Sequence, residues 1–526
     1  MPIHPAGEHL AARALATPDK AAIVLASTGE VRTYADLDAA SARLARVFRD
    51  RGLRTGDHLA VLVDNDAAFF EVVWAAMRTG LFVTPINWHL NAAEAGFIVR
   101  DCGATALVAS ARLDSVLAAM PADDLAAVTL RLATDGRLDG FEAIDALVAA
   151  TTDSTVPDEH EGTWMFYSSG TTGTPKGILP PLGPADLGAP SFLTAMLGGL
   201  FGFDSDTVYL SPAPLYHAAP AGWTTGTHRL GGTVVVMDRF DPVELLRAIE
   251  AHRVTHVQLV PTHMIRLLDL PESQRRGFDL RSLRRVIHAS APCPVEVKRR
   301  FIDWVGPIVW EYYSGSEGAG FCCIDSAEWG EHPGSVGRSI SGAIHVLDAD
   351  GSELPAGAEG EVWFETTRPF EYHNDAESTR SAWNDRGWAW LGDVGRVDDE
   401  GYLYLTDRAS HMIISGGVNI SPREAEDVLT SHPAVADVAV VGVGHPEMGE
   451  QVAAYVQLTS GASASEDELI AWCRDRLSHF KCPRAVWFLD ELPRLPTGKL
   501  LKRHLPVPAP PEPAPHRTSG AQPEAR

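Results

Sequence analysis

The feature that most constrains this chain is a short run dense in glycine, hydroxyl groups and lysine, Tyr167-Ser168-Ser169-Gly170-Thr171-Thr172-Gly173-Thr174-Pro175-Lys176-Gly177. It follows the apolar run Trp164-Met165-Phe166, so we expect a buried strand that ends in an exposed loop. Glycine lacks Cβ, so its backbone N–H can approach an anion closely, while hydroxyls and an ammonium group add further donors. The run therefore predicts a phosphate-binding loop. Its candidate binding residues are Ser168, Ser169, Gly170, Thr171, Thr172, Gly173 and Lys176.

The loop is not the usual P-loop. That motif places its lysine directly before a serine or threonine, whereas Lys176 lies between Pro175 and Gly177. A flexible polar surface loop is the alternative to a phosphate site. The run closely resembles the nucleotide-phosphate loop of the AMP-forming adenylating superfamily, which contains acyl-CoA synthetases, peptide-synthetase adenylation domains and luciferases. The resemblance implies further motifs of the superfamily downstream in a fixed order, and residues 163–503 contain them.

Composition limits the class of protein. A chain of 526 residues is too long for one ordinary core, so we expect at least two structural units. The formal net charge of −25 argues against a nucleic-acid-binding face and against anionic membranes. No apolar run predicts a membrane span, and the start lacks the pattern of a signal peptide. Six cysteines without disulfide or metal spacing, and no His-Glu-x-x-His pair, favour a cytoplasmic protein without a catalytic zinc.

Alternating strand and helix patterns predict an α/β fold. Helical spacing at 33–51 and 69–77 separates short apolar runs. The runs that predict strands lie at 21–26, 59–63, 82–86, 106–109, 208–210, 234–236, 256–261 and 286–288. Strands separated by helices of this length imply crossover connections, so we expect a large N-terminal domain of mainly parallel sheets with helices.

Two segments that follow predicted strands resemble pocket segments of the superfamily. The stretch Ser211-Pro212-Ala213-Pro214-Leu215-Tyr216-His217 matches a Pro-Leu-aromatic-His segment that borders the carboxylate pocket, which implies a gating role for His217. A polar loop histidine is the alternative. Small side chains at the end of a strand leave room for a flat base or an acyl group. The small residues that resemble the lining of the adenine pocket are Ala289, Ser290, Ala291 and Pro292.

The stretch Trp310-Glu311-Tyr312-Tyr313-Ser314-Gly315-Ser316-Glu317-Gly318 resembles the superfamily pattern Tyr-Gly-x-Thr-Glu. The resemblance implies that Tyr313 stacks on adenine and that Ser316 keeps the hydroxyl of the usual threonine. It also implies that Glu317 associates with Mg²⁺, a hard cation that a carboxylate suits. Ser314 departs from the pattern by replacing a glycine. A surface glutamate after a turn is the alternative for Glu317.

Two later motifs resemble the ribose site and the domain boundary of the superfamily. Asp393 matches the aspartate of Thr-Gly-Asp, whose carboxylate accepts from both ribose hydroxyls, and Leu391 replaces the threonine. Arg408 matches the nucleotide-contacting arginine at the boundary. Ser410 and His411 replace the usual hinge residues, and either change could alter the balance between two domain orientations.

The resemblance divides the chain near the boundary motif. It implies an N-terminal adenylate-forming domain at 1–407 and a small mobile α+β lid domain at 408–503. Within the lid, the runs at 435–443 and 452–458 predict paired strands, and 466–477 predicts a helix. Gly416 and Gly417 fit the turn near the CoA arm, and Lys499 matches the catalytic lysine. The Pro-rich segment 504–526 is predicted to be a disordered or extended tail.

Together the motifs imply an acid–CoA ligase that uses ATP, Mg²⁺ and CoA. A carboxylate attacks the α-phosphate of ATP to give acyl-AMP and pyrophosphate, and the CoA thiol then takes the acyl group. Attack brings two anions together, so the expected catalytic groups are positive ones aimed at the phosphate. They are Lys176, Lys499 and the Mg²⁺ beside Glu317, with His217 at the acid. The alternatives are an enzyme of the thiol-transfer half alone, an adenylation enzyme loading a carrier protein, and a non-catalytic nucleotide-binding protein.

The acid is predicted to be bulky or apolar. Four residues expected near it are small, and no basic residue lies among them. They are Ala289, Ala291, Ala319 and Gly320. The resemblance also implies a monomer or homodimer.

Overall fold

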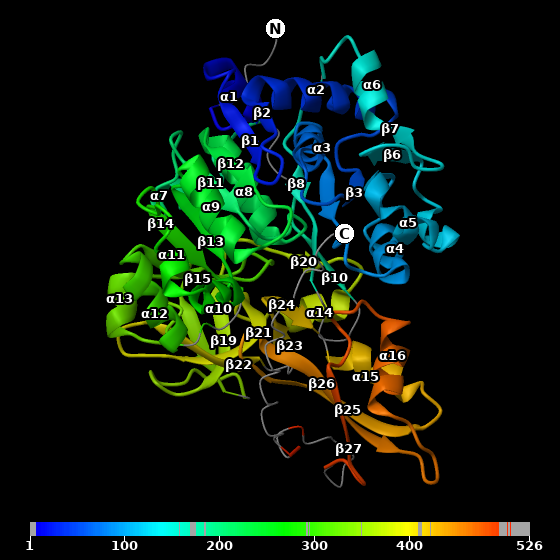
Figure 1. Cartoon of the computed structure of the whole chain (residues 1–526), viewed down its shortest axis with the longest axis vertical. Coiled ribbons are helices and arrows are strands. Elements are labelled where there is room, and N and C mark those ends of the chain that lie inside the picture. The colour runs from blue at the N-terminus through cyan, green and yellow to red at the C-terminus, as the bar shows by residue number, and fades with distance from the viewer. Residues whose placement is uncertain are drawn as a thin grey trace, which may run out of the picture.

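The structure is a computed structural model of the chain (Figure 1). It describes residues 7–156, 158–168, 175–182, 186–290, 293, 295–348, 350–408, 413–420, 422–493, 502, 505 and 506. Two large sheets and two small ones, with their helices, form the body of the molecule. A further sheet with two helices, orange to red in Figure 1, packs below the body and is called the lid here.

One large sheet is wholly parallel. Its strands lie in the order β7-β6-β5-β3-β4-β8, and every registered pair is parallel. The central strands are apolar because helices cover both faces. The strands are β3 (His58–Leu62), β4 (Phe82–Pro85), β5 (Ala106–Ser110), β6 (Leu130–Thr134), β7 (Glu142–Ala143) and β8 (Thr163–Trp164). The helices are α2 (Tyr34–Asp50), α3 (Ala67–Met77), α4 (Ala92–Asp101), α5 (Asp114–Ala118), α6 (Ile144–Ala150) and the short η1 (Ala111–Leu113) and η2 (Ala122–Leu125).

The other large sheet has nine strands in the order β17-β16-β15-β14-β13-β11-β12-β1-β2. The six from β15 to β1 pair in parallel, and the flanking strands are antiparallel. The strands are β1 (Ala21–Leu25), β2 (Val31–Thr33), β11 (Val208–Ser211), β12 (Thr233–Val236), β13 (His256–Leu259), β14 (Arg285–His288), β15 (Val309–Tyr313), β16 (Cys322–Asp325) and β17 (Arg338–Ser339). The helices are α1 (Leu10–Ala16), α7 (Phe192–Gly199), α8 (Ala218–Leu230), α9 (Pro242–His252), α10 (Pro261–Asp269), α11 (Glu272–Arg275), α12 (Val295–Val305) and α13 (Ser326–Glu331). The predicted α/β body of mainly parallel sheets is confirmed.

Two small antiparallel sheets complete the body, and of their strands the sequence predicts the run Tyr402-Leu403-Tyr404-Leu405, which overlaps Leu403–Arg408. One has the order β20-β10-β9 and the other the order β18-β19-β21-β22. The strands are β9 (Phe166–Ser168), β10 (Lys176–Leu179), β20 (Glu371–Tyr372), β18 (Ile344–Leu347), β19 (Gly360–Glu365), β21 (Trp388–Val397) and β22 (Leu403–Arg408), and α14 (Ala376–Ser381) follows β20.

Two strand predictions need correction. The run Trp164-Met165-Phe166 was expected to be one buried strand, but it belongs to β8 and β9 in different sheets. Met165 is fully buried, while the rings of Trp164 and Phe166 stack at 5.2 Å and stay partly exposed. The predicted strand at 256–261 is also too long. It ends at Leu259, because Pro261 begins α10, where its fixed φ suits the first helical turn.

The lid is a five-stranded sheet with two helices. Its long strands β25 and β26 pair antiparallel, as predicted. The predicted helix at 466–477 is three residues too long, because Asp475 is already the C-cap. The elements are β23 (Ile413–Ser415), β24 (Val418–Ile420), α15 (Pro422–Thr430), β25 (Val435–His445), β26 (Gly449–Leu458), α16 (Glu466–Arg474) and β27 (Ala485–Phe488).

The end of the described chain packs on the lid. Leu505 is buried with Ala439, Tyr455 and Leu492, and the Tyr455 hydroxyl donates to the Pro506 carbonyl. These two residues belong to the segment predicted as a tail, and 507–526 lie outside the described residues.

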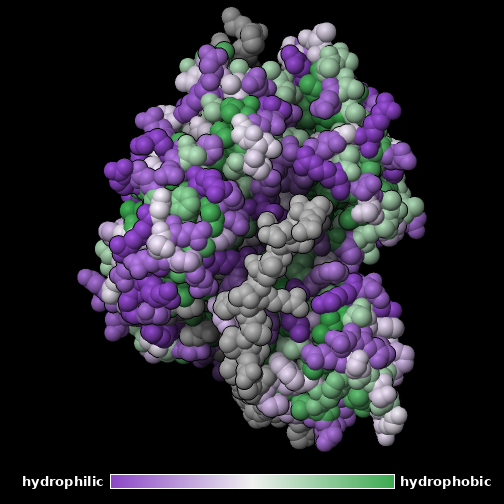
Figure 2. All heavy atoms as spheres, viewed as in Figure 1, coloured by the Kyte–Doolittle hydropathy of each residue, from purple (hydrophilic) through white to green (hydrophobic). Residues whose placement is uncertain are grey.

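The described surface is mainly polar. Figure 2 shows hydrophilic side chains over most of the visible face, with hydrophobic ones scattered between them. The exposed large hydrophobic residues are Leu15, Val31, Ile340 and Phe488, from separate elements. Among the described helices, none has the length and apolar character needed to cross a membrane.

Candidate active site

The carboxyl ends of four adjacent parallel strands gather the predicted motifs at one edge of the nine-stranded sheet. These strands are β11, β13, β14 and β15, and they are neighbours in the sheet. The segment ending in His217 follows β11, Ala289 and Ser290 follow β14, and Tyr313 ends β15. In open parallel sheets ligands bind outside the carboxyl ends of the strands, so this edge is the candidate site.

Tyr313 and Asp393 meet at this edge. The Tyr313 hydroxyl donates to Asp393 Oδ2 at 2.5 Å, although the two residues lie 80 positions apart. Asp393 is buried on β21, its backbone pairs with that of Arg408 on β22, and the Trp390 indole donates to its carbonyl at 3.2 Å. A fixed carboxylate can accept hydrogen bonds from the two hydroxyls of a diol, and the neighbouring phenol ring can stack on a base.

Two departures from the superfamily pattern have local explanations. Ser314 stands in place of a glycine, and its hydroxyl donates to the Gly320 carbonyl at 2.8 Å, which ties the ends of the following loop together. Leu391 stands in place of a threonine and packs on the same loop, since its side chain lies 3.0 Å from where a Cβ on Gly315 would be. Both substitutions shape the loop that carries Glu317.

Glu317 and Lys176 converge on one tyrosine that the sequence did not single out. The Tyr372 hydroxyl donates to Glu317 Oε1 at 2.9 Å. The Lys176 ammonium lies 5.4 Å from the centroid of the Tyr372 ring and donates to the Ser378 hydroxyl at 2.5 Å. Asp375, the N-cap of α14, lies 3.5 Å from the same ammonium. Segment 371–378 therefore joins the predicted phosphate lysine to the predicted Mg²⁺ acid.

The described donors fit a magnesium ion bound with a nucleotide. No group of three or more His, Cys, Asp or Glu side chains forms a metal cage among the described residues. Mg²⁺ rarely uses such cages, because it keeps several waters and binds through one or two carboxylates plus substrate phosphates. Glu317 supplies one carboxylate of this kind, and the exposed Ser316 lies next to it.

His217 lies in an aromatic cluster at the start of α8. It occupies the N-cap position, and its ring lies 4.4 Å from that of Tyr216, which itself lies 4.5 Å from Trp88. Burial and the neighbouring His89 lower the pKa of His217 to about 4. The imidazole is therefore neutral at physiological pH, so it can border a carboxylate as a hydrogen-bonding or packing group rather than as a cation.

The lid places its glycine turn on the adenine-type segment. Ser290 has a φ of +75°, a left-handed conformation that is uncommon for a residue with a side chain. A Cβ built on Gly417 would lie 3.9 Å from the Ser290 Cβ and 3.3 Å from Val260 at the end of β13. A Cβ built on Gly416 would lie 4.0 Å from the Thr262 hydroxyl oxygen on α10 of the body. The predicted turn thus reaches the strand-end edge of the body.

A buried ion cluster joins the lid to the body on another side. Lys481 of the lid donates at 2.7 Å both to Glu94 of the body and to Glu424 of the lid. Ser478 also donates to Glu94, and it accepts from the Asn91 backbone N–H at 2.9 Å. Burial raises the pKa of Glu424 to about 7, and Lys481 opposes part of that rise.

Several predicted site residues lie outside the described structure. Lys176, Ser168, His217, Ala289, Ser290, Tyr313, Ser316, Glu317, Asp393, Gly416 and Gly417 are described, and Arg408 is described in its backbone. Those outside the described residues are Ser169, Gly170, Thr171, Thr172, Gly173, Ala291, Pro292 and Lys499, together with the hinge residues Ser410 and His411. Ser168 ends β9 and pairs in register with Lys176 at the start of β10, so the two ends of the predicted loop adjoin.

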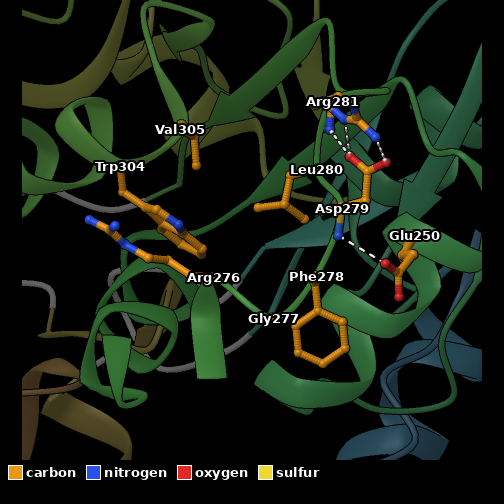
Figure 3. A pocket seen from close by; sticks show the side chains of 9 residues that line it. All are labelled: Glu250, Arg276, Gly277, Phe278, Asp279, Leu280, Arg281, Trp304 and Val305. Atoms are coloured by element: carbon orange, nitrogen blue, oxygen red, sulfur yellow. Dashed lines mark hydrogen bonds and ion pairs between the residues drawn. The ribbon is translucent and has the colours of Figure 1, made fainter. Parts of the chain in front are cut away.

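The hollow in Figure 3 belongs to the opposite edge of the sheet. Its residues close α9, precede β14 and close α12, which are the amino ends of the parallel strands. They include Glu250, Asp279 and Trp304. The Arg281 guanidinium donates to the Asp279 carboxylate, and the Asp279 N–H donates to the Glu250 carboxylate. We therefore assign the site from the converging side chains at the carboxyl ends.

The fold, with a parallel-sheet body, a separate lid sheet and motifs at the strand ends, defines an AMP-forming adenylating enzyme. The AMP-binding enzyme family matches residues 10–370, and the AMP-binding enzyme C-terminal domain matches residues 424–499. The chain belongs to this family, in its acyl-CoA synthetase branch, and is an AMP-forming acid–CoA ligase. Enzymes of this class use ATP and CoA. This assignment excludes the non-catalytic alternative.

Curated relatives cover almost the whole chain. A feruloyl-CoA synthase of an Amycolatopsis species is 34% identical over 481 residues, which is 90% of this chain and 93% of the relative. A long-chain fatty-acid–CoA ligase of Mycobacterium tuberculosis is 31% identical over 503 residues, which is 94% of this chain and 97% of the relative.

Solved structures match the fold of the chain with different TM-scores. An amide bond synthetase of Marinactinospora thermotolerans matches with a TM-score of 0.82 at 29% identity, covering 94% of this chain and 98% of its own. The o-succinylbenzoate CoA synthetase of Bacillus subtilis appears twice at 27% identity, each time covering 94% of this chain and 97% of its own. A double-mutant form bound to its product analogue has a TM-score of 0.79, and the complex with its acyl-adenylate intermediate has 0.63.

Proposed function

We propose that the enzyme activates a carboxylic acid as its acyl-adenylate and then transfers the acyl group to the thiol of CoA. The observation that carries this proposal is the meeting of two pairs, Tyr313 with Asp393 and Lys176 with Glu317 through Tyr372. The first pair suits a nucleoside and the second suits phosphates with a cation. Both are needed to bind ATP with its α-phosphate presented to an acid.

In the first step the carboxylate oxygen bonds to the α-phosphorus and the bond to the pyrophosphate oxygen breaks. Glu317 would hold Mg²⁺, which when bound there would neutralise charge on the phosphates. Lys176, fixed by Ser378 and Asp375, adds a positive charge on the leaving-group side. Lys499 is assigned to the same step as a group delivered by the lid. Neutral His217 borders the acid and adds no charge that would hold it away from the phosphate.

In the second step the lid closes a thiol channel over the adenylate. The contact of Gly417 with Ser290 and Val260 supports this lid orientation for the structure seen here. The synthetase solved in two states supports it too, because the same enzyme matches better with its product analogue than with its adenylate, 0.79 against 0.63. The sulfur attacks the acyl carbon, AMP leaves with the bonding electrons, and the thiol proton passes to solvent. The division into a body at 1–407 and a lid at 408–503 is part of the proposal.

The acid is proposed to be bulky or apolar, with an aromatic acid favoured. Ala289 is buried at the end of β14, next to the adenine-type segment. Two of the small residues predicted to line the acid pocket are small for reasons of packing elsewhere. Gly320 is small because a Cβ there would come within 2.3 Å of the Phe364 ring, and Ala319 packs with Ile178 and Phe370. The aromatic preference is supported by two relatives whose acyl groups, feruloyl and o-succinylbenzoyl, are aromatic, and the long-chain fatty-acid–CoA ligase is the reason to include a long-chain acid in the tests.

A panel of acids assayed in two half-reactions tests the proposal. Acid-dependent exchange of pyrophosphate into ATP reports adenylation, and thioester formation from a supplied acyl-adenylate reports transfer. We expect both activities, with aromatic acids turning over faster than acetate. Thioester formation without exchange would instead establish the transfer-only enzyme. If product formed only with a carrier protein or an amine, that acceptor would take the place of CoA in the proposal. The amine is included because an amide bond synthetase is among the similar structures.

Lys499→Ala separates the two steps. We expect the variant to lose acid-dependent pyrophosphate exchange and to keep most of its thioester formation, because the lysine serves only the adenylation orientation. Equal loss of both activities would show that the role assigned to Lys499 is wrong.

A further inference from the structure

The residue that stands out beyond these roles is Tyr372, because it touches both charged groups of the phosphate side. Its hydroxyl donates to Glu317 at 2.9 Å, and its ring lies under the Lys176 ammonium at 5.4 Å. A phenol that donates to a carboxylate restricts that carboxylate to one rotamer and one oxygen. The face of its ring attracts a cation. One side chain thus bears on two charges of opposite sign.

The backbone around Tyr372 is fixed by the strand that carries Lys176. In the small sheet Tyr372 pairs with Ile178, two residues after Lys176, and the His373 N–H donates to the Gly177 carbonyl at 2.8 Å. The Tyr372 N–H donates to the Thr379 hydroxyl at 2.9 Å, which anchors the other side. The half-buried ring packs in a cluster with Ile178 and Phe370. A site on such rigid elements holds its groups more accurately than one on a loop.

The oxygen of Glu317 that Tyr372 does not hold lies beside Gly315. A Cβ on Gly315 would lie 2.5 Å from Glu317 Oε2, so glycine at 315 leaves room for that oxygen in its present place. Glu317 is therefore held by a hydrogen bond at one oxygen, while the glycine keeps space open for the other. This arrangement fixes a carboxylate before its cation arrives, and such outer partners change metal affinity or activity by about 10- to 100-fold when they are removed.

We propose that Tyr372 is a positioning residue for adenylation, which sets Glu317 for the divalent cation and Lys176 for the pyrophosphate leaving group. The inference rests on the proposed function, since it deepens the phosphate side of that site. The ligand that this part of the site would bind is the divalent-cation complex of a nucleoside triphosphate.

Tyr372→Phe is the variant that separates the two contacts, because it removes the hydroxyl and keeps the ring. The expected result is an affinity for Mn²⁺, measured with a non-hydrolysable ATP analogue by electron paramagnetic resonance, weaker by about tenfold. In the exchange assay the half-saturating Mg²⁺ concentration rises by a similar factor. Tyr372→Leu removes the ring as well, so the KM for ATP should rise further than in Tyr372→Phe.

A matched control exists in the same chain. Tyr402 donates to Glu328 Oε1 at 3.2 Å, which is another tyrosine–glutamate bond outside the site. Tyr402→Phe should leave Mn²⁺ affinity and Mg²⁺ dependence within twofold of the parent. If Tyr372→Phe behaves like this control, the positioning role is overturned.

A double-mutant cycle guards against a merely structural effect. Glu317→Gln removes the carboxylate that Tyr372 is proposed to hold, so adding Tyr372→Phe should change cation affinity no further. Additive losses would show that Tyr372 acts through general stability and would overturn the inference. Mn²⁺ binding with the ATP analogue does not require turnover. If exchange is absent in the parent enzyme, the proposed function fails while the cation titration still decides the role of Tyr372.

Discussion

Two buried lysines of this molecule each donate to a buried glutamate, but one pair lies within the body and the other joins the body to the lid. Lys298 on α12 lies fully buried and donates to Glu311 of β15 at 2.6 Å, with both partners inside the body. Lys481 is 3% exposed and bridges Glu94 of the body to Glu424 of the lid. The first pair exists whenever the body is folded. The second is complete only when the lid has the present orientation.

The difference decides what each pair can do. Breaking a buried pair by removing one partner leaves a desolvated charge, which costs about 3–5 kcal/mol. Inside the body the charge of Glu311 stays buried whatever the position of the lid, and only proton uptake by Glu311 or by His288, 3.6 Å away, can reduce its cost short of unfolding. We therefore expect Lys298 and Glu311 to affect stability and not lid orientation. At the lid contact, the proposed rotation of the lid would return Glu94 to water. Under that proposal the same chemistry contributes to a balance between two folded states.

The largest expected effect comes from Lys298→Met. The variant should unfold more easily by about 3–5 kcal/mol in urea titration, because Glu311 remains buried without its cation. Both half-reactions should fall together, in proportion to the folded fraction. Lys298→Met with Glu311→Leu should recover most of the loss, since two apolar groups replace the pair. A selective loss of one half-reaction would contradict a purely structural role.

Lys481→Met should act on lid orientation instead. Without the cation, Glu94 and Glu424 face each other at the contact, so this orientation becomes less favourable by about 1–3 kcal/mol, a typical coupling between two sites. Thioester formation from a supplied acyl-adenylate should fall about 5- to 150-fold by the same relation, while acid-dependent pyrophosphate exchange is kept.

The matched control is Lys502→Met. Lys502 donates at 2.7 Å to Glu426 and to the Val440 carbonyl, and all three residues belong to the lid. This variant should alter lid stability without changing the ratio of the two half-reactions. If both lysine variants change the ratio equally, the contact with Glu94 is not what sets the orientation.

Glu424 makes the lid contact depend on pH. Its pKa is raised from an ordinary 4.5 to about 7 by burial, so the docked lid binds a proton more readily than a lid whose Glu424 is in water. Docking is therefore strongest at low pH, and that gain is lost as pH rises through about 7. Energy transfer between dyes on body and lid should report more docking at pH 5.5 than at pH 8. Glu424→Gln should flatten this dependence, and an unchanged slope in that variant would exclude Glu424.

The parallel body was predictable because its signals are local. Apolar runs separated by helical spacing identify β3, β5 and β13 without knowledge of their partners. The small sheet β20-β10-β9 was not, since β9 and β20 are only two or three residues long and show no alternation. A strand of two or three residues is too short to show the alternation of apolar and polar side chains that identifies a strand. In the other small sheet the run Tyr402-Leu403-Tyr404-Leu405 predicts β22.

The candidate site also contains residues that local motifs predict and residues that only the fold brings together. Tyr313, Glu317 and Asp393 lie in recognisable motifs, whereas Tyr372 acquires its meaning only by reaching Glu317 across 55 positions. Glu94 and Lys481 are 387 positions apart, and no spacing in the sequence connects them. One usable signal was the lysine in the mostly apolar stretch Phe480-Lys481-Cys482, because a buried lysine requires a charged partner. The identity of that partner came only from the fold.

The smallest effect is expected at a second contact between body and lid, the ion pair of Arg266 on α10 with Glu447 in the turn between β25 and β26. The side chains are 42% and 35% exposed, so water and salt screen the pair, and exposed pairs contribute at most about 1 kcal/mol. Arg266→Gln should therefore change the ratio of thioester formation to pyrophosphate exchange by less than about fivefold, from that limit. The change should shrink in 0.5 M salt, because at that ionic strength the Debye length falls to about 4–5 Å and weakens attraction between exposed charges. The Lys481→Met effect should persist at the same salt concentration, since its pair is buried. Equal salt sensitivity of the two variants would mean that burial does not distinguish the two contacts.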